Sequence, residues 1–218
     1  MDVPERLHDP SVDAYKYLGL AHAMPRRPPI RFAERDLLLS RDLSARGIRG
    51  ARLVKLLKDG ALVQRARGLY MTADADVTEH HSLAEVARLA PSAVVCLLSA
   101  LRFHGLGTQL PSEVWLAIHV KAWRPRLTGL PVRIVHMSGA ALTEGVENRD
   151  IEHVPVRITS AAKTVADCFK FRNKIGLDVA LEALREYRRQ KRSLDELRRL
   201  ARVCRVDGVM RPYLEAIL

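Results

Sequence analysis

Residues 40–72 read SRDLSARGIRGARLVKLLKDGALVQRARGLYMT, and this stretch decides the fold that we expect at the start of the chain. Its pattern predicts a short helix over residues 40–46 and, after Ile48, a second helix that continues to about Asp59. Gly47 and Gly60 are placed to end them, because glycine readily adopts the left-handed conformation found just after a helix. Two helices separated by so short a connection predict a tight helix-turn-helix unit.

The two ends of this stretch carry further local signals. Ser40 is a suitable N-cap for the first helix, with Asp42 in the first turn, where its charge complements the helix dipole. After the second helix the residues alternate between apolar and polar. This alternation predicts a small hairpin with strands over 62–64 and 69–71 that turns at residues 65–68.

The second predicted helix has two different faces. At 100° per residue one face gathers leucines, and the opposite face gathers basic side chains. The apolar face holds Leu53, Leu56 and Leu57, and the basic face holds Arg52, Lys55 and Lys58. A helix pair followed by a basic hairpin is the layout of a winged helix-turn-helix, whose second helix enters the DNA major groove.

The charge of the chain agrees with a nucleic-acid partner. The 218 residues include 36 Lys and Arg against 25 Asp and Glu, which gives a net charge of +11, and the isoelectric point is about 10.1. Such a basic protein is a reasonable candidate for phosphate binding. The candidate contacts to double-stranded DNA are Arg46, Arg49, Arg52, Lys55, Lys58, Arg65 and Arg67.

The rest of the chain mixes helices and strands, so the expected class is α+β: a winged helix-turn-helix domain within residues 1–76, then a larger α+β domain over 77–218 that ends in helices. A helix over 10–24 and a turn at PRRPP (25–29) precede the helix pair.

After the helix pair and hairpin, the pattern predicts helices over 78–89 and 92–104 and strands over 113–119, 131–137, 145–151 and 154–159. Helices follow through the last 58 residues. Ser160 and Ser193 are their expected N-caps, and Ser193 is expected to form a capping box with Glu196.

A second basic cluster occupies the C-terminal helical region. Its arginines are either a solvated surface or a second surface for phosphate or an acidic partner. They are Arg185, Arg188, Arg189, Arg192, Arg198, Arg199 and Arg202.

Other chemistries have weaker sequence support. Ser160 and Lys163 fit S-x-x-K, but the companion motifs of that enzyme class are missing. His119, His136 and His153 could meet only if the strands align them, and Asp150 with Glu152 lacks the lysine of a nuclease motif. We therefore expect no catalytic residues, no metal and no cofactor, and we expect Cys96, Cys168 and Cys204 to be small core residues.

No apolar stretch is long enough to span a bilayer, since the longest, residues 89–101, has 13 residues. The N-terminus shows no apolar run typical of a signal peptide. We therefore expect a cytoplasmic protein with no membrane partner.

Three longer stretches resemble one protein family. They are SALRFHGLGTQLPSEVWLAI (99–118), SAAKTVADCFKFRNKIGLDVALEALREYRRQ (160–190) and CRVDGVMRPYLEAIL (204–218). They resemble the AbiEi-type antitoxins of bacterial type IV toxin–antitoxin systems, and residues 47–70 are similar to the family's winged helix. The resemblance covers roughly residues 40–218. It departs at Arg49 and Gly50, where the family commonly has a Ser or Thr helix cap.

The resemblance implies an antitoxin that represses its own operon by binding inverted repeats in the promoter. It also implies that the C-terminal domain neutralises a nucleotidyltransferase toxin, with or without touching it. A winged-helix regulator without a toxin partner, a nuclease and a protein–protein adaptor remain alternatives. The polar positions that match the family in the C-terminal domain are Lys163, Asp167, Lys170, Arg172, Asn173, Lys174 and Asp178.

Overall fold

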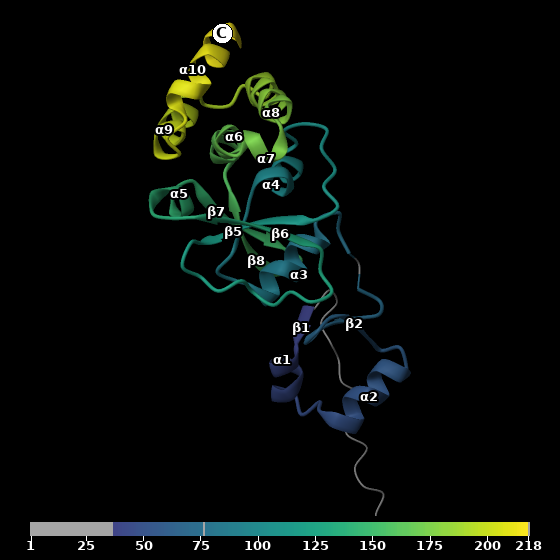
Figure 1. Ribbon diagram of the computed structural model, residues 1–218. Coiled ribbons are helices and arrows are strands. Elements are labelled where there is room, and N and C mark those ends of the chain that lie inside the picture. The colour runs from purple at the N-terminus through teal and green to yellow at the C-terminus, as the bar shows by residue number, and fades with distance from the viewer. Residues whose placement is uncertain (1–36, 76, 218) are drawn as a thin grey trace, which may run out of the picture. The chain divides into compact units, whose positions relative to one another are not determined.

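A computed structural model describes residues 37–75 and 77–217, apart from the side chain of Ile217 (Figure 1). The predicted helix over 10–24 and the turn at 25–29 lie outside the described residues. The described residues all belong to one compact unit. The proposed boundary between residues 76 and 77 falls inside that unit and stays a prediction.

The first described elements are two helices and a small antiparallel sheet with strand order β1-β3-β2. The predicted helix pair and hairpin are confirmed as secondary structure. The elements are β1 (Leu37–Leu39), α1 (Ser40–Ala45), α2 (Gly50–Lys58), β2 (Leu62–Ala66) and β3 (Leu69–Thr72).

The start of α1 differs from the prediction. Leu39, not Ser40, occupies the N-cap position, and the Asp42 carboxylate accepts a hydrogen bond from the Leu39 backbone N–H at 2.8 Å. Ser40 instead donates its hydroxyl to the carbonyl of Gly68 in the β2–β3 turn, at 3.5 Å. The side chain three residues into the helix therefore satisfies the free N–H, and Ser40 is released to contact the hairpin.

The hairpin is longer than predicted and its turn is tighter. β2 continues to Ala66, and its register with β3 shifts between Gln64 and Ala66, so that Arg65 is the extra residue of a bulge. Arg67 and Gly68 alone make the turn, and Gly68 has a φ of +80°. The bulge re-aims the side chain of Arg65, as bulges in strands commonly do.

A five-stranded mixed sheet forms the centre of the larger part, with strand order β6-β5-β4-β8-β7. The predicted strands over 113–119, 131–137, 145–151 and 154–159 are confirmed to within a residue. The strands are β4 (Val94–Val95), β5 (Val114–His119), β6 (Val132–Met137), β7 (Val146–Ile151) and β8 (Val154–Thr159).

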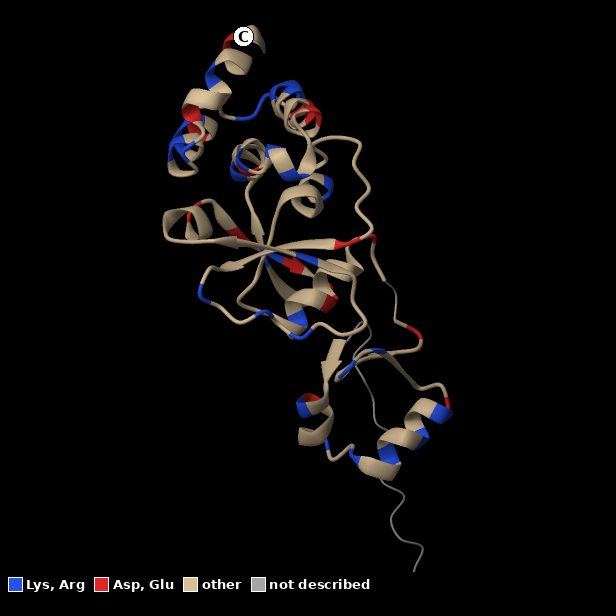
Figure 2. Ribbon diagram, viewed as in Figure 1, with Lys and Arg blue, Asp and Glu red and all other residues tan. Residues whose placement is uncertain are grey.

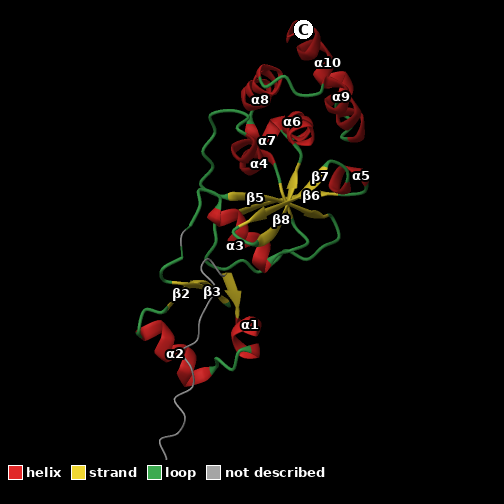
Figure 3. Ribbon diagram, turned by 180° about the vertical axis from the view of Figure 1, so that it is seen from behind, coloured by secondary structure: helices red, strands yellow, loops and turns green. Residues whose placement is uncertain are grey.

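Helices cover both faces of this sheet (Figures 1 and 3). β5 shows the consequence, because Trp115 and Ala117 join one core cluster while Leu116 and Ile118 join the other. Alternate residues of a strand point to opposite faces, so both faces of this strand are buried. One face carries α3 (His81–Leu89), and the other carries α4 (Leu97–His104) and α6 (Ala161–Lys170). Beyond α6 lies a further layer of helices, α8 (Leu177–Arg189), α9 (Leu194–Val203) and α10 (Asp207–Ile217), which pack on α6 and on one another. The short α5 (Ala140–Thr143) and α7 (Arg172–Ile175) lie in connections.

Two helix predictions were wrong at their starts. The helix expected over 78–89 begins only at His81, and the helix expected over 92–104 begins at Leu97. Val94 and Val95 form a central strand, antiparallel to β5 and parallel to β8. β-branched residues suit such a buried strand, and a two-residue strand is too short to show a period in the sequence.

The predicted N-caps of the later helices are confirmed, but the capping box of Ser193 with Glu196 forms only its Ser193 half. Ser160 accepts a hydrogen bond from the Lys163 N–H at the start of α6, and Ser193 accepts one from the Glu196 N–H at the start of α9. All three cysteines are free and buried, as expected for core residues. Among residues 37–75 and 77–217, no helix combines the length and the apolar composition that crossing a membrane requires.

Candidate nucleic-acid interface

The helix α2 presents a basic face to solvent. Lys55 and Lys58 are exposed and Arg52 is half-buried. The predicted inner leucines, Leu53, Leu56 and Leu57, are each half-buried. Figure 2 shows the basic positions spaced along α2. A helix with one such face can bring its cations to the phosphates of DNA, which would supply most of a sequence-independent affinity.

Arg46 and Arg49 lie in the connection between α1 and α2, and both are exposed. The Arg49 guanidinium donates a hydrogen bond to the Ser44 carbonyl at 3.3 Å. Arg49 also takes the N-cap position of α2, and its side chain makes no capping hydrogen bond. The backbone N–H groups of the first turn therefore lack the side-chain cap that a Ser or Thr would supply.

The two arginines predicted at the tip of the hairpin differ in their surroundings. Arg67 is in the turn itself and is exposed. Arg65 points back toward the larger part, where its Nε lies 2.7 Å from the Glu85 carboxylate on α3. Only Arg67 is thus placed at the tip, and the charge of Arg65 is already compensated within the protein.

The Glu85 carboxylate belongs to a buried polar network. His81 lies between two acids, with Nε2 at 3.2 Å from Glu85 and Nδ1 at 2.6 Å from Glu152. Glu152 also accepts hydrogen bonds from the backbone N–H and the hydroxyl of Thr78, at 2.7 and 2.8 Å. The network ties the hairpin, through Arg65, to α3 and to the β7–β8 turn.

In this network the positive charge of protonated His81 and the negative charges of Glu85 and Glu152 stabilise one another. The Glu85 contact, joined by Glu152, raises the pKa of His81 above its ordinary value of 6.5, although burial opposes the shift. Burial alone would raise the pKa of Glu85, but the close contact with His81 and the hydrogen bond from Arg65 outweigh it and hold that pKa below its ordinary value of 4.5. The pKa of Glu152 is lowered in the same way by His81 and Thr78 against burial.

The arginines of the second basic cluster are partly engaged with neighbouring side chains. Arg189 pairs with Glu186 at 2.7 Å and Arg199 with Glu144 at 2.6 Å. Arg192 donates to the side-chain oxygen of Gln190 at 2.7 Å. Arg185, Arg198 and Arg202 are exposed, and Arg188 is half-buried.

The polar positions matched to the antitoxin family have different environments. Lys163 and Asp167 are completely buried, with Nζ 2.5 Å from both carboxylate oxygens. Arg172 is half-buried and donates to the Phe169 carbonyl at 2.9 Å. The exposed positions are Lys170, Asn173, Lys174 and Asp178.

The alternative site residues are not brought together. The register pairs Ile118 with His136 and His119 with Met137, so the two histidines point to opposite faces of the sheet. Within the described part of the chain, no three His, Cys, Asp or Glu side chains gather closely enough to hold a metal ion. The Asp150 carboxylate accepts the backbone N–H of His153 at 3.1 Å.

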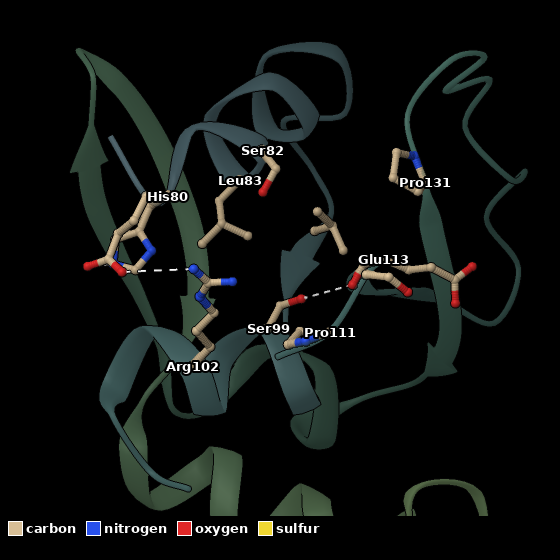
Figure 4. Close-up of a pocket in the computed structure, with 11 residues that line it drawn as sticks. His80, Ser82, Leu83, Ser99, Arg102, Pro111, Glu113 and Pro131 are labelled. Atoms are coloured by element: carbon tan, nitrogen blue, oxygen red, sulfur yellow. Dashed lines mark hydrogen bonds and ion pairs between the residues drawn. The ribbon is translucent and has the colours of Figure 1, made fainter. Parts of the chain in front are cut away.

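A small pocket lies between α3, α4 and the start of β5 (Figure 4). Three of its polar residues have protein partners. Arg102 lies 3.9 Å from Glu79, Glu113 pairs with Arg133 at 2.9 Å, and Ser99 accepts the Trp115 N–H at 2.9 Å. The arrangement favours a structural role for these groups.

One feature of the surface was missed from the sequence. Trp123, in the connection between β5 and β6, is 96% exposed. It stands in KAWRPR (121–126), and an aromatic residue between basic ones was the available signal. Arg126 from this connection lines a surface hollow together with Arg67 of the hairpin turn.

Comparisons with known proteins show the fold. No protein-family model matches the chain, and no curated protein matches it. The structure is similar to the crystal structure of the RV2827C protein from Mycobacterium tuberculosis, with a TM-score of 0.50 and 14% sequence identity, over 82% of this chain and 75% of that one.

Proposed function

We propose that this chain is a DNA-binding antitoxin that represses its own operon. In this proposal the described elements from β1 to β3 are the winged helix-turn-helix, with α2 as the recognition helix and the β2–β3 turn as the wing. The observation that carries the DNA-binding part is the basic, solvent-facing side of α2, with Arg67 exposed at the hairpin turn. This is the arrangement in which a recognition helix reads base edges while a wing holds phosphate.

The antitoxin part of the proposal is supported by the resemblance of residues 99–118, 160–190 and 204–218 to AbiEi-type antitoxins. The domain over 77–218 would neutralise a nucleotidyltransferase toxin, either by contact or by a route without contact. Both activities would take place in the cytoplasm. The protein itself carries out no reaction in this proposal and needs no cofactor.

The test of DNA binding is fluorescence anisotropy with the chain's own promoter duplex and a scrambled duplex, over a salt series. We expect a preference for the promoter of about 10³ or more, the low end of specific recognition. With about 6 phosphates neutralised, log K should fall against log salt with a slope of about −5. Equal and steeply salt-dependent binding to both duplexes would contradict specific repression.

The test of the antitoxin part is growth rescue on co-expression with the neighbouring gene. We expect the full chain to restore growth. Promoter binding without rescue would leave a winged-helix regulator that has no toxin partner.

A further inference from the structure

The connection between β5 and β6 exposes a tryptophan, Trp123, to solvent. The backbone turns tightly after β5, where Ala122 N–H donates to the His119 carbonyl at 2.8 Å. Four residues after Trp123, Leu127 is buried in the core cluster beneath α3. Trp123 is held between this turn and this anchor, and 96% of it faces solvent. Tryptophan is enriched at interfaces, because its large ring is apolar and its indole N–H can donate a hydrogen bond.

The charged residues beside Trp123 in the sequence are all basic. Lys121, Arg124 and Arg126 are exposed, and within the described residues none of them forms an ion pair with an acidic side chain. The sequence from residue 114 to residue 143 contains no Asp or Glu at all. This segment therefore complements a polyanion and would repel a basic partner.

The same connection adjoins the hairpin that carries Arg67. A Cβ placed on Gly129 would lie 3.7 Å from the Cα of Ala66 in β2, which brings the two backbones close together. Arg126 and Thr128 line one hollow with Arg67 and Tyr70. The basic side chain of the hairpin turn, Arg67, is therefore next to the basic side chains of the β5–β6 connection.

We propose that residues 121–126 are a further binding segment for double-stranded DNA, next to the β2–β3 turn and outside the winged helix-turn-helix itself. Lys121, Arg124 and Arg126 bind phosphates of the duplex beyond those held by Arg67, and Trp123 packs against the sugars and base edges of the adjoining groove. This inference rests on the proposed function. It extends the DNA-binding surface of the chain onto the larger α+β part.

The first test measures how many phosphates the protein neutralises. Arg124→Ala/Arg126→Ala and a control, Lys170→Ala/Arg211→Ala, each remove two exposed positive charges, and of these four residues Arg211 alone has an ion-pair partner among the described residues, Asp207. On the promoter duplex we expect the first variant to bind more weakly and to reduce the steepness of the salt slope by about 2, one unit for each phosphate that is no longer neutralised. The control should keep the wild-type slope.

The second test uses Trp123 as a reporter. The chain has 2 Trp, and Trp115 is buried with 5% exposure. In Trp115→Phe only Trp123 emits, so iodide should quench the free protein strongly and the promoter complex weakly. Trp123→Phe, which retains only the buried reporter, should show no such protection.

The outcomes separate the two proposals. If the wild-type protein shows no preference for the promoter, the proposed function fails and this inference fails with it. If the wild type prefers the promoter but the Arg124→Ala/Arg126→Ala variant keeps its slope and DNA leaves Trp123 open to iodide, this inference alone is overturned. Loss of growth rescue in that variant with DNA binding intact would assign the segment to a protein partner and would also overturn it.

Discussion

Lys163 and Asp167 form an ion pair with no exposure to water, one turn apart on α6. Removing one partner of such a pair leaves a buried charge without compensation, which costs about 3–5 kcal/mol, whereas replacing both by apolar residues of similar volume is often neutral. We expect Lys163→Met to lower the free energy of unfolding by that amount, and Lys163→Met/Asp167→Leu to recover much of it. Urea denaturation measures both. This account would be contradicted if the loss of stability in the double variant equalled the sum of the losses in Lys163→Met and Asp167→Leu.

His81 makes stability depend on pH. Its raised pKa stabilises the fold below about pH 6.5, and this contribution is lost as the pH rises through the shifted value. The lowered pKa values of Glu85 and Glu152 stabilise the fold above about pH 4.5, and that contribution is lost as the pH falls. All three groups therefore contribute fully only between these values.

The expected result is a stability difference between wild type and His81→Gln that is largest between about pH 4.5 and 6.5 and shrinks on both sides. Urea midpoints measured from pH 4 to pH 9 test it. His136→Gln, at an exposed position on β6, is the control and should follow the wild-type profile. A constant difference for His81→Gln across the range would remove the ionisation of His81 from the explanation.

At the scale of elements, we expect the basic residues of α2 to have different roles in DNA binding. Arg52, nearer the start of the helix and half-buried, is expected to read bases, and Lys58 at the end is expected to hold phosphate. Arg52→Ala should weaken promoter binding by about 1–3 kcal/mol and scrambled binding less. Lys58→Ala should weaken both alike. Anisotropy on the two duplexes distinguishes them, and equal losses for Arg52→Ala would exclude its base-reading role.

The β2–β3 hairpin separates a structural arginine from a DNA-facing one. Because Arg65 compensates the buried Glu85 carboxylate, Arg65→Ala should lower the free energy of unfolding by about 1–3 kcal/mol. Arg67 is exposed in the turn, so Arg67→Ala should keep the wild-type stability and weaken DNA binding. Urea denaturation and anisotropy on both variants provide the test. A fully stable Arg65→Ala protein with impaired binding would reverse the assignment.

For the molecule as a whole, the hairpin and β1 share a core with the larger part. One cluster of buried residues contains Leu37, Leu39 and Leu69 together with Leu83 and Val86 of α3. Arg88 on α3 also donates to the Leu37 carbonyl at 3.0 Å and pairs with Asp42 at 2.7 Å. These interactions tie the elements before residue 76 to α3.

A chain that starts at residue 77 should therefore be less stable than the full chain. Cutting there would expose the face of α3 that packs against β1 and β3, and newly exposed apolar surface loses its hydrophobic stabilisation. We expect a lower urea midpoint and stronger binding of a hydrophobic dye than in the full chain. Equal midpoints would show that residues 77–218 fold independently, as the boundary predicted from the sequence implies.

Much of the secondary structure could be predicted because its signals are local. Residues close together in the sequence determine the caps at Ser160 and Ser193, the glycines that end the short helices, and the strands of the larger sheet. The predictions failed at Ser40, at the start of α3, in the extent of the β2–β3 hairpin and at Val94–Val95. At Ser40, the Asp42 carboxylate instead accepts the hydrogen bond from the Leu39 N–H at the start of the helix. At Val94–Val95, pairing with β5 and β8 makes a strand of a stretch whose sequence resembles a helix.

The sequence by itself determined the α+β class, the helix pair with its hairpin, the basic face of α2 and the net positive charge. Only the tertiary structure decided which cations remain available to a partner, because an ion pair depends on proximity in space. Arg65 meets Glu85 twenty residues later and Arg199 meets Glu144 on another element. The residues around Trp123 meet no acid among the described residues, because the fold anchors their connection at Leu127 and leaves it beside the hairpin.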